Sequence, residues 1–469
     1  MCAALRRLHS ASGEHAFEAL QASVRPLAQA IPCRGEDVHV LSSPAEFLHE
    51  LHAGISAARQ RVVLSSLYFG VEGRAEKGVL SALAAALRAR PELQVDVLLD
   101  ARRGTRPVSD GCGGRTSSAS ELAVMLLSVP GGRASVRLHA TPSLSAGVLP
   151  PRLRELTGVL HVKAAVFDDT ALWTGANVAE TYLTRRQDRY LRFAAQPRLA
   201  DATCSLVAAL VHCSARLAPD GTLTPPEGVH RVTHAHGRQL ASALSSVLQP
   251  APTRSHAAAA DADSLAFLTV QAGYCGLRHD EHVTAALLTT TASLGGVLNL
   301  STPYLNPPHT TERLLAMQPR LSMLTASPQC HGWAGASGAA SYVPAAYAVM
   351  EHRTLRRLTA MRGDAQTLRM LEYERMGWEF HAKGLWWSPE EGEPMASVVG
   401  SGNYGLRSMR RDLEANLVLL TRHEGLRSAL GAEWRALSEH ASEVSAHQLA
   451  NRRPGFTARL AAHAARRWM

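Results

Sequence analysis

Apolar residues along the chain come in short runs that alternate with helical stretches. Residues 61–70 (RVVLSSLYFG) and 296–306 (GVLNLSTPYLN) are apolar strands that each lead to the pattern S-x-x-Y. Each is followed, after a helical stretch, by another apolar strand, at 95–100 and at 321–327. Strands that alternate with helices are typical of an α/β fold, and the recurrence of one arrangement predicts two similar halves.

The repeat also predicts where the halves begin and end. We expect them over about residues 36–217 and 264–445, each a mixed sheet flanked by helices, related by a pseudo-twofold axis with the active site at their interface. Residues 218–263, rich in Pro, Gly, Ala and His, would be the linker, and residues 446–469 a helical tail. Residues 1–35 lack the apolar core of a secretory signal, which fits either a short transit peptide or an ordinary first helix.

Composition narrows the class of protein. With 469 residues, 46% apolar and 19% charged, the chain has the balance of a folded protein with a sizeable core. Its longest apolar stretches, such as residues 205–211, end well before the roughly 18 residues that a membrane span needs. The seven cysteines form no CxxC pair, which argues against a zinc site or a disulfide framework and favours a reducing compartment. A net charge of +9 indicates anionic partners: nucleic acid, an acidic membrane surface or phosphorylated substrates.

Lysine is scarce in this basic chain, and two of its lysines lie in the same local pattern. Of 49 basic residues only Lys77, Lys163 and Lys383 are lysines, and two of them follow a histidine as H-x-K, after His161 and His381. Random order would give roughly 0.14 such triplets, so the repetition is informative. Both triplets fall in predicted buried strands, where positions i and i+2 share one face.

The repeat continues beyond each triplet. A turn and a second strand follow, ending in a glycine and an asparagine, Asn177 in the first half and Asn403 in the second. An acid comes eleven residues after each asparagine, at Asp188 and at Glu414. Matched positions in both copies favour a duplicated functional unit over isolated polar residues.

An imidazole beside an ammonium group suits phosphate chemistry. One histidine would attack a phosphodiester or diphosphate to give a phosphohistidine, and the other would deprotonate the incoming hydroxyl. The acids would bind the far ring nitrogen of each imidazole, with Glu414 as the partner of His381. Lys163, Lys383 and the two asparagines would hold the non-bridging oxygens, and the scheme needs no metal or other cofactor.

Arginines near predicted strand ends are candidate substrate contacts, although each can equally belong to a solvated face. They are Arg102, Arg103, Arg106, Arg185, Arg186, Arg410 and Arg411.

Residues 161–168 (HVKAAVFD) match the H-x-K-x4-D motif, and the chain resembles the phospholipase D superfamily. Longer stretches, 175–190, 326–347, 372–387 and 400–417, resemble the eukaryotic mitochondrial phosphatidylglycerophosphate synthases. The resemblance implies transfer of phosphatidyl from CDP-diacylglycerol to sn-glycerol 3-phosphate, with release of CMP, as the first step of phosphatidylglycerol and cardiolipin synthesis. It also implies a peripheral enzyme on an anionic membrane surface, at the matrix side of the mitochondrial inner membrane, and no nucleic-acid partner.

The resemblance assigns roles to individual residues. It makes Asp168 a third member of the first catalytic set, His161 the nucleophile, and Ser337 a departure from an expected lysine. The second half has Ser388 where the first has Asp168, which suggests that this aspartate braces the turn or the opposite half rather than touching phosphorus.

Two other functions remain open from the sequence. Water in place of the acceptor alcohol would make the protein a phospholipase or a nuclease-like phosphodiesterase. A catalytically inactive membrane-binding protein is the other alternative, although intact duplicated H-x-K units argue against it.

Overall fold

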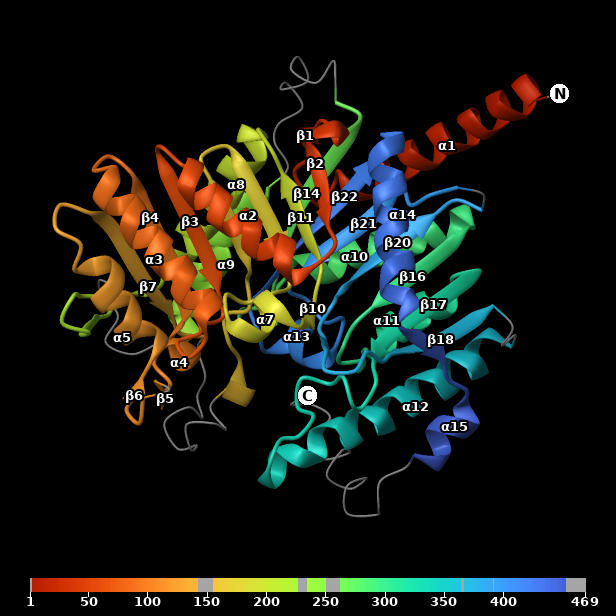
Figure 1. Ribbon diagram of the computed structural model, residues 1–469. Coiled ribbons are helices and arrows are strands. Elements are labelled where there is room, and N and C mark those ends of the chain that lie inside the picture. The colour runs from red at the N-terminus through yellow and green to blue at the C-terminus, as the bar shows by residue number, and fades with distance from the viewer. Residues whose placement is uncertain are drawn as a thin grey trace.

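The computed structural model describes residues 2–110, 112–141, 155–226, 234–249, 262–363, 367–390 and 392–452. Two large mixed sheets lie side by side, the first built from the red-to-yellow part of the chain and the second mainly from its green-to-blue part (Figure 1). Helices cover the faces of both sheets. The predicted α/β class with mixed sheets flanked by helices is confirmed.

The first sheet has the strand order β13-β12-β7-β4-β3-β8-β9-β11-β2. Its strands are β2 (Val38–Leu41), β3 (Arg61–Ser66), β4 (Gln94–Asp100), β7 (Arg133–His139), β8 (Ala164–Phe167), β9 (Thr170–Thr174), β11 (Tyr190–Phe193), β12 (Ala215–Leu217) and β13 (Leu223–Thr224). The central strands β7, β4 and β3 are parallel, and β8, β9, β11 and β2 continue antiparallel.

The second sheet has the order β1-β14-β22-β21-β20-β16-β17-β18-β23, with β15 paired to β14. Its strands are β1 (Ile31–Cys33), β14 (Ser264–Ala272), β15 (Leu277–Arg278), β16 (Val297–Ser301), β17 (Arg320–Ala326), β18 (Leu368–Tyr373), β20 (Gly384–Ser388), β21 (Ala396–Gly400), β22 (Glu414–Thr421) and β23 (Ala441–Glu443). Strands β18, β17 and β16 are parallel and β20, β21, β22 and β14 antiparallel, so the second sheet repeats the order and directions of the first.

Two short ladders complete the strands. β10 (Arg186–Gln187) pairs with β19 (Glu379–Phe380) across the two halves, and β5 (Val108–Ser109) pairs with β6 (Arg115–Thr116). The α-helices of the described residues are α1 (Cys2–Val24), α2 (Pro44–Ala57), α3 (Arg74–Ala89), α4 (Ala101–Gly104), α5 (Ser118–Leu122), α7 (Glu180–Thr184), α8 (Pro197–His212), α9 (His234–Leu248), α10 (His279–Leu294), α11 (His309–Ala316), α12 (Val343–Arg362), α13 (Leu406–Arg410), α14 (Glu424–Glu439) and α15 (Ala446–Asn451).

Local chemistry fixes several of these boundaries. Ser43 caps α2 by accepting a hydrogen bond from the backbone N–H of Glu46, and Pro44 occupies the first helical position. Gly363 ends α12 with φ of 70°, a conformation that glycine adopts without steric cost. Along β3, Val62 and Leu64 face α2 and α3, whereas Val63 faces α8, which explains why the strand is apolar at successive positions.

The core continues across the two halves. One buried cluster joins Trp173 and Leu206 of the first half to Val270 and Leu417 of the second. Helix α9 lies within the predicted linker and adds Leu244 to this cluster, so part of that segment is packed structure. No helix in the described part of the chain is long and apolar enough to cross a membrane.

Part of the predicted N-terminal segment packs against the second half. Phe17 and Leu20 of α1 share a buried cluster with Leu287 of α10, and β1 pairs with β14. Residues 13–24 therefore belong to an ordinary, packed first helix. The segment boundaries and a targeting role for residues 1–35 stay predictions.

Candidate active site

The first H-x-K triplet lies where the two halves meet. The sequence predicted that His161 lies inside a strand. In the structure β8 begins only after Lys163, so His161 lies before that strand. Its backbone N–H donates instead to the carbonyl of Leu413, 2.8 Å away in the second half. Lys163 folds back and donates from Nζ to the carbonyl of His161 at 2.7 Å.

The second triplet has the matching position. His381 lies between β19 and β20, and its backbone N–H donates to the carbonyl of Gln187 in the first half at 2.8 Å. Lys383 Nζ donates to the carbonyl of His381 at 2.6 Å and lies 3.7 Å from the carboxylate of Asp188. Each histidine is therefore held by a backbone bond to the other half.

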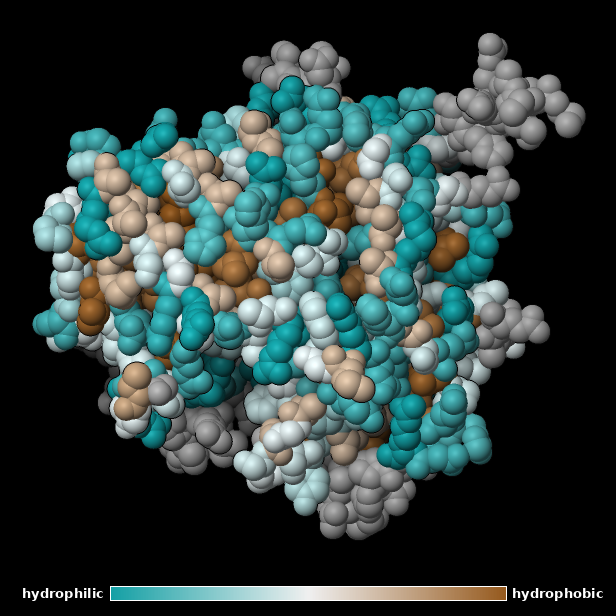
Figure 2. Space-filling model, viewed as in Figure 1, coloured by the Kyte–Doolittle hydropathy of each residue, from teal (hydrophilic) through white to brown (hydrophobic). Residues whose placement is uncertain are grey.

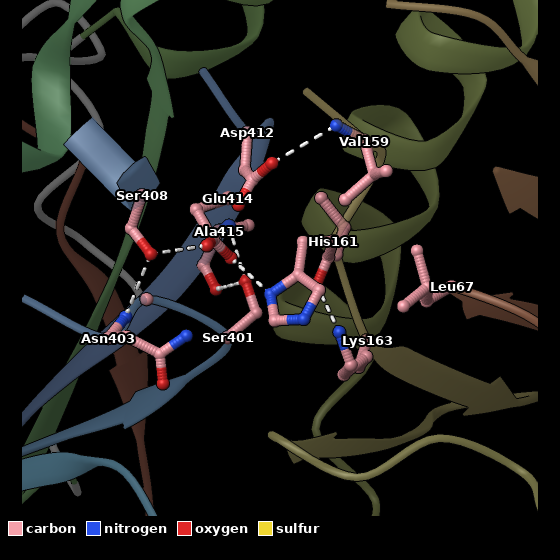
Figure 3. A network of polar contacts seen from close by, with 12 residues as sticks. Leu67, Val159, His161, Lys163, Ser401, Asn403, Ser408, Asp412, Glu414 and Ala415 are labelled. Carbon is pink, nitrogen blue, oxygen red and sulfur yellow. Dashed lines mark hydrogen bonds and ion pairs between the residues drawn. The ribbon is translucent and has the colours of Figure 1, made fainter. Parts of the chain in front are cut away.

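The acids are exchanged between the halves. Nδ1 of His161 bonds Oε2 of Glu414 at 2.8 Å, and Nδ1 of His381 bonds Oδ2 of Asp188 at 2.6 Å. The predicted pairing of Glu414 with His381 is wrong. His161 follows Leu160, which bridges to Leu413 just before Glu414 at the start of β22 (Figure 3). His381 follows Phe380, which pairs with Gln187 just before Asp188.

Hydrogen bonds extend the first pair into a network. Ser408 Oγ donates to Oε1 of Glu414 at 2.7 Å and accepts from the backbone N–H of Asn403 at 3.2 Å (Figure 3). The backbone N–H of Asn403 is therefore linked to His161 through Ser408 and Glu414.

The other asparagine, Asn177, accepts at Oδ1 from the backbone N–H of Leu67 at 3.3 Å, while its buried Nδ2 has no partner among the described residues. That amide is a donor available for a substrate oxygen.

Burial sets the protonation states of the site. It lowers the pKa of His161 and of His381 well below the usual range, aided by Lys163 and Lys383, so both imidazoles are neutral near pH 7. Burial also lowers the pKa of Lys163 to about 7 and that of Lys383 to about 8. Each histidine also lies within electrostatic range of the other triplet's lysine, which brings the two triplets into one site.

The acids shift in the opposite sense. Burial raises the pKa of Asp188 to about 6 despite the nearby Lys383, and it raises the pKa of Glu414. The site therefore combines neutral histidines with lysines of lowered pKa and acids of raised pKa.

Asp168 lies away from this site. Its carboxylate accepts three backbone N–H bonds, from Arg59, Gln60 and Arg61, at 2.8, 2.8 and 2.9 Å. These residues precede or begin β3, whereas the site lies at the other end of β8, roughly 16 Å from Asp168 for five extended residues. The catalytic assignment implied by the family motif is corrected, and the turn-bracing role agrees with these contacts.

Three of the candidate arginines hold the first half together. Arg102 donates to Oγ1 of Thr141 at 3.1 Å and to the carbonyl of Gly158. Arg106 pairs with Glu155 at 3.0 Å, and Arg103 lies 3.6 Å from the same carboxylate. These contacts give all three side chains structural partners within the first half.

Of the other candidates, Arg186 borders the site. It pairs with Glu379 and stacks over the ring of Tyr182, whose hydroxyl lies 3.4 Å from Nε2 of His381. Arg185 and Arg410 are exposed and Arg411 is half-buried.

Several site residues escaped prediction. Tyr304 presents its ring edge-on to His381, with centroids 6.0 Å apart, and to His331 at 5.1 Å. The repeated S-x-x-Y pattern marked this tyrosine, but only as a strand end. A narrow pocket beside these rings is lined by His331, Tyr347 and Glu351 together with small and apolar side chains.

No family model matches the chain, but named proteins are similar to it along most of its length. The CDP-diacylglycerol–glycerol-3-phosphate 3-phosphatidyltransferase, mitochondrial, of Gallus gallus is 32% identical, over 90% of this chain and 80% of its own. The protein of the same name from Homo sapiens is 32% identical, over 92% and 82%. The Saccharomyces cerevisiae CDP-diacylglycerol–glycerol-3-phosphate 3-phosphatidyltransferase is 28% identical, over 88% and 84%.

A solved structure has the same fold. Phosphatidylserine synthase of Haemophilus influenzae superposes with a TM-score of 0.76, covering 97% of this chain and all of its own. Its sequence is 19% identical to this one, so the likeness concerns the fold alone.

Proposed function

The chain belongs to the family of the CDP-diacylglycerol–glycerol-3-phosphate 3-phosphatidyltransferases, and from this we propose that its two crossed histidine–acid pairs transfer phosphatidyl through a phosphohistidine. The donor is CDP-diacylglycerol, the acceptor is sn-glycerol 3-phosphate, and the products are phosphatidylglycerophosphate and CMP. One observation carries the mechanism: two neutral histidines, each fixed through Nδ1 by an acid of the other half, share a site with two lysines.

In the first step Nε2 of His161 attacks the phosphorus next to diacylglycerol. A nitrogen–phosphorus bond forms, the phosphorus–oxygen bond to CMP breaks, and its electron pair leaves with CMP. The ring becomes positively charged, and Glu414, which accepts the Nδ1–H bond, stabilises that charge. Lys163, Lys383 and the unpartnered amide of Asn177 are the donors for the non-bridging oxygens.

In the second step glycerol 3-phosphate attacks the phosphohistidine. Nε2 of His381 takes the proton from the acceptor hydroxyl as the new oxygen–phosphorus bond forms and the nitrogen–phosphorus bond breaks. Asp188 stabilises the resulting imidazolium through Nδ1. His161 returns to its neutral state, and His381 releases its proton to solvent.

The decisive experiment gives the purified protein CDP-diacylglycerol with and without glycerol 3-phosphate, and follows CMP and lipid products. We expect phosphatidylglycerophosphate only with the acceptor, and no turnover in His161→Ala or His381→Ala. The exposed His39 provides a matched control, and His39→Ala should keep full activity. Phosphatidic acid as the main product with excess acceptor would instead identify a hydrolase of the phospholipase D type.

The place of action follows from the same relatives. Those from Gallus gallus and Homo sapiens are named mitochondrial, which supports a mitochondrial protein here. A lipid substrate and a net charge of +9 support a peripheral enzyme on an anionic membrane surface, and we propose that this surface is the matrix face of the inner membrane. Fractionation with matrix and inner-membrane markers tests this placement.

A further inference from the structure

Exposed large apolar side chains gather beside the active site. Three of those in the described part of the chain belong to two neighbouring segments, and the rest are scattered. The full set is Val124, Leu223, Met317, Trp333, Tyr342, Met361 and Met376. Single exposed apolar residues are ordinary on a soluble surface, whereas a group next to a site points to an interaction surface.

The first segment runs from residue 332 to residue 345 and contains no charged side chain. Most of it is exposed or half-buried, with Trp333 46% exposed and Tyr342 55% exposed. It leads into α12, whose beginning lies at the bottom of the view, where pale and tan rather than teal side chains gather (Figure 2). Solvated surfaces of this size usually carry several charges.

This segment starts at the site itself. His331 packs edge-on against Tyr304, and Tyr304 packs against the catalytic His381. Trp333 follows two residues later and donates its backbone N–H to Nδ1 of His331 at 3.2 Å. The exposed tryptophan therefore stands at the rim of the site.

The second segment, residues 374–378, borders the same rim. Cys330 accepts at Sγ from the backbone N–H of Arg375 at 3.2 Å, and its carbonyl accepts from Phe380 at 2.8 Å. Met376 at the tip of this turn is 98% exposed. The carbonyl of the exposed Arg185 accepts from Glu379 at 3.0 Å, which brings a cation to the same edge.

We propose that residues 332–345 and 374–378 form the surface by which the protein docks on an anionic lipid bilayer, with Trp333, Tyr342 and Met376 entering the interface. The proposal rests on the proposed function, because the donor substrate carries two acyl chains. Drawing such chains into water costs about 0.8 kcal/mol per CH2 group, so the mouth of the site has to meet the bilayer. Tryptophan and tyrosine favour the membrane interface, and Arg185 and Arg375 can pair with lipid phosphates.

Binding is tested on vesicles of phosphatidylcholine and phosphatidylglycerol. We expect brominated acyl chains to quench the fluorescence of the wild-type protein and to quench Trp333→Phe less. The double variant Trp333→Ser/Tyr342→Ser should bind roughly tenfold more weakly in a sedimentation assay. Its matched control, Val124→Ser/Met317→Ser, removes equally exposed apolar side chains elsewhere and should bind like the wild type.

Enzyme activity provides an independent test of the docking surface. The double variant should lose activity on vesicles but keep its kcat on substrate dispersed in detergent micelles. Equal binding of variant and control, or equal quenching with and without Trp333, would overturn the proposal. Light scattering that shows residues 332–345 joining two copies of the chain would also overturn the proposal. Vesicle binding needs no turnover, so an inactive wild type that still binds through Trp333 would refute the proposed function and not the surface.

Discussion

Exchange of the acids between the halves predicts opposite kinetic defects for two similar substitutions. In the proposed mechanism Glu414 serves the nucleophile His161, whereas Asp188 serves the base His381. Glu414→Gln should therefore block formation of the phosphohistidine. Asp188→Asn should allow its formation and block its transfer to the acceptor, because CMP leaves as a stable phosphate and needs little help from the second histidine.

The magnitude follows from the distance. Unit charges 2.8 Å apart attract by about 6 kcal/mol at an effective dielectric constant of about 20. This is the most that Glu414 can contribute when His161 becomes positively charged, and at 1.36 kcal/mol per tenfold it corresponds to roughly four orders of magnitude. An amide at this position can also reverse the imidazole tautomer, an effect worth a similar factor in catalytic triads. We expect losses of about 10³ to 10⁴ in steady-state turnover for both variants.

Rapid quenching in alkali separates the two defects, because phosphohistidine is stable to base. Asp188→Asn should release about one CMP per enzyme in a burst and retain phosphatidyl on His161, which mass spectrometry detects. Glu414→Gln should show no burst. The reverse result would refute the crossed assignment, provided that His161→Ala, which tests the identity of the nucleophile directly, also lacks the burst.

Other properties of the structure give further measurable outcomes. Burial lowers the pKa of Lys163 to about 7 and raises that of Asp188 to about 6. In a pH–rate profile, kcat/KM for glycerol 3-phosphate should therefore fall as pH rises through the first value and as it drops through the second, and Lys163→Arg should shift the alkaline limb upward. Asp168→Asn weakens three backbone hydrogen bonds and should lower the free energy of unfolding in urea by about 1–3 kcal/mol while kcat changes less than about twofold; a large loss of kcat would restore a catalytic role. Arg189→Met leaves the buried carboxylate of Glu433 without a charged partner and should cost about 3–5 kcal/mol of stability in the same assay. Adding Glu433→Gln should recover part of that loss, and no recovery would contradict the pairing.

Much of the fold and the composition of the site could be predicted from the sequence. Apolar strands that lead to S-x-x-Y, and the duplicated triplets, asparagines and acids, all lie at corresponding positions in or beside the strands of the two sheets. Such local patterns are readable because each depends on a few neighbouring residues. The same local reading extended the strands over His161 and His381, where bonds to the other half replace the ladder.

The hydrogen-bond and ion-pair partners of the site residues depend on tertiary contacts, which could not be predicted from the sequence. Equal spacing of Asp188 and Glu414 from their asparagines suggested that each acid serves its own half, yet spacing is the same whether the pairs are parallel or crossed. Arg102 shows the same limit, because an arginine after a strand fits a substrate contact and a brace to the carbonyl of Gly158 equally well. Only the folded position separates the two roles.

The exchange of the acids between the halves has a structural consequence that two independent halves would not have. A histidine of one half is oriented, and its positive charge is stabilised, by the acid of the other half. The buried pair between Arg189 and Glu433 and the shared apolar cluster fix the same interface, so docking of the halves and assembly of the site are one event. Neither half alone contains one of these histidine–acid pairs, so the proposed chemistry requires both copies of the repeat.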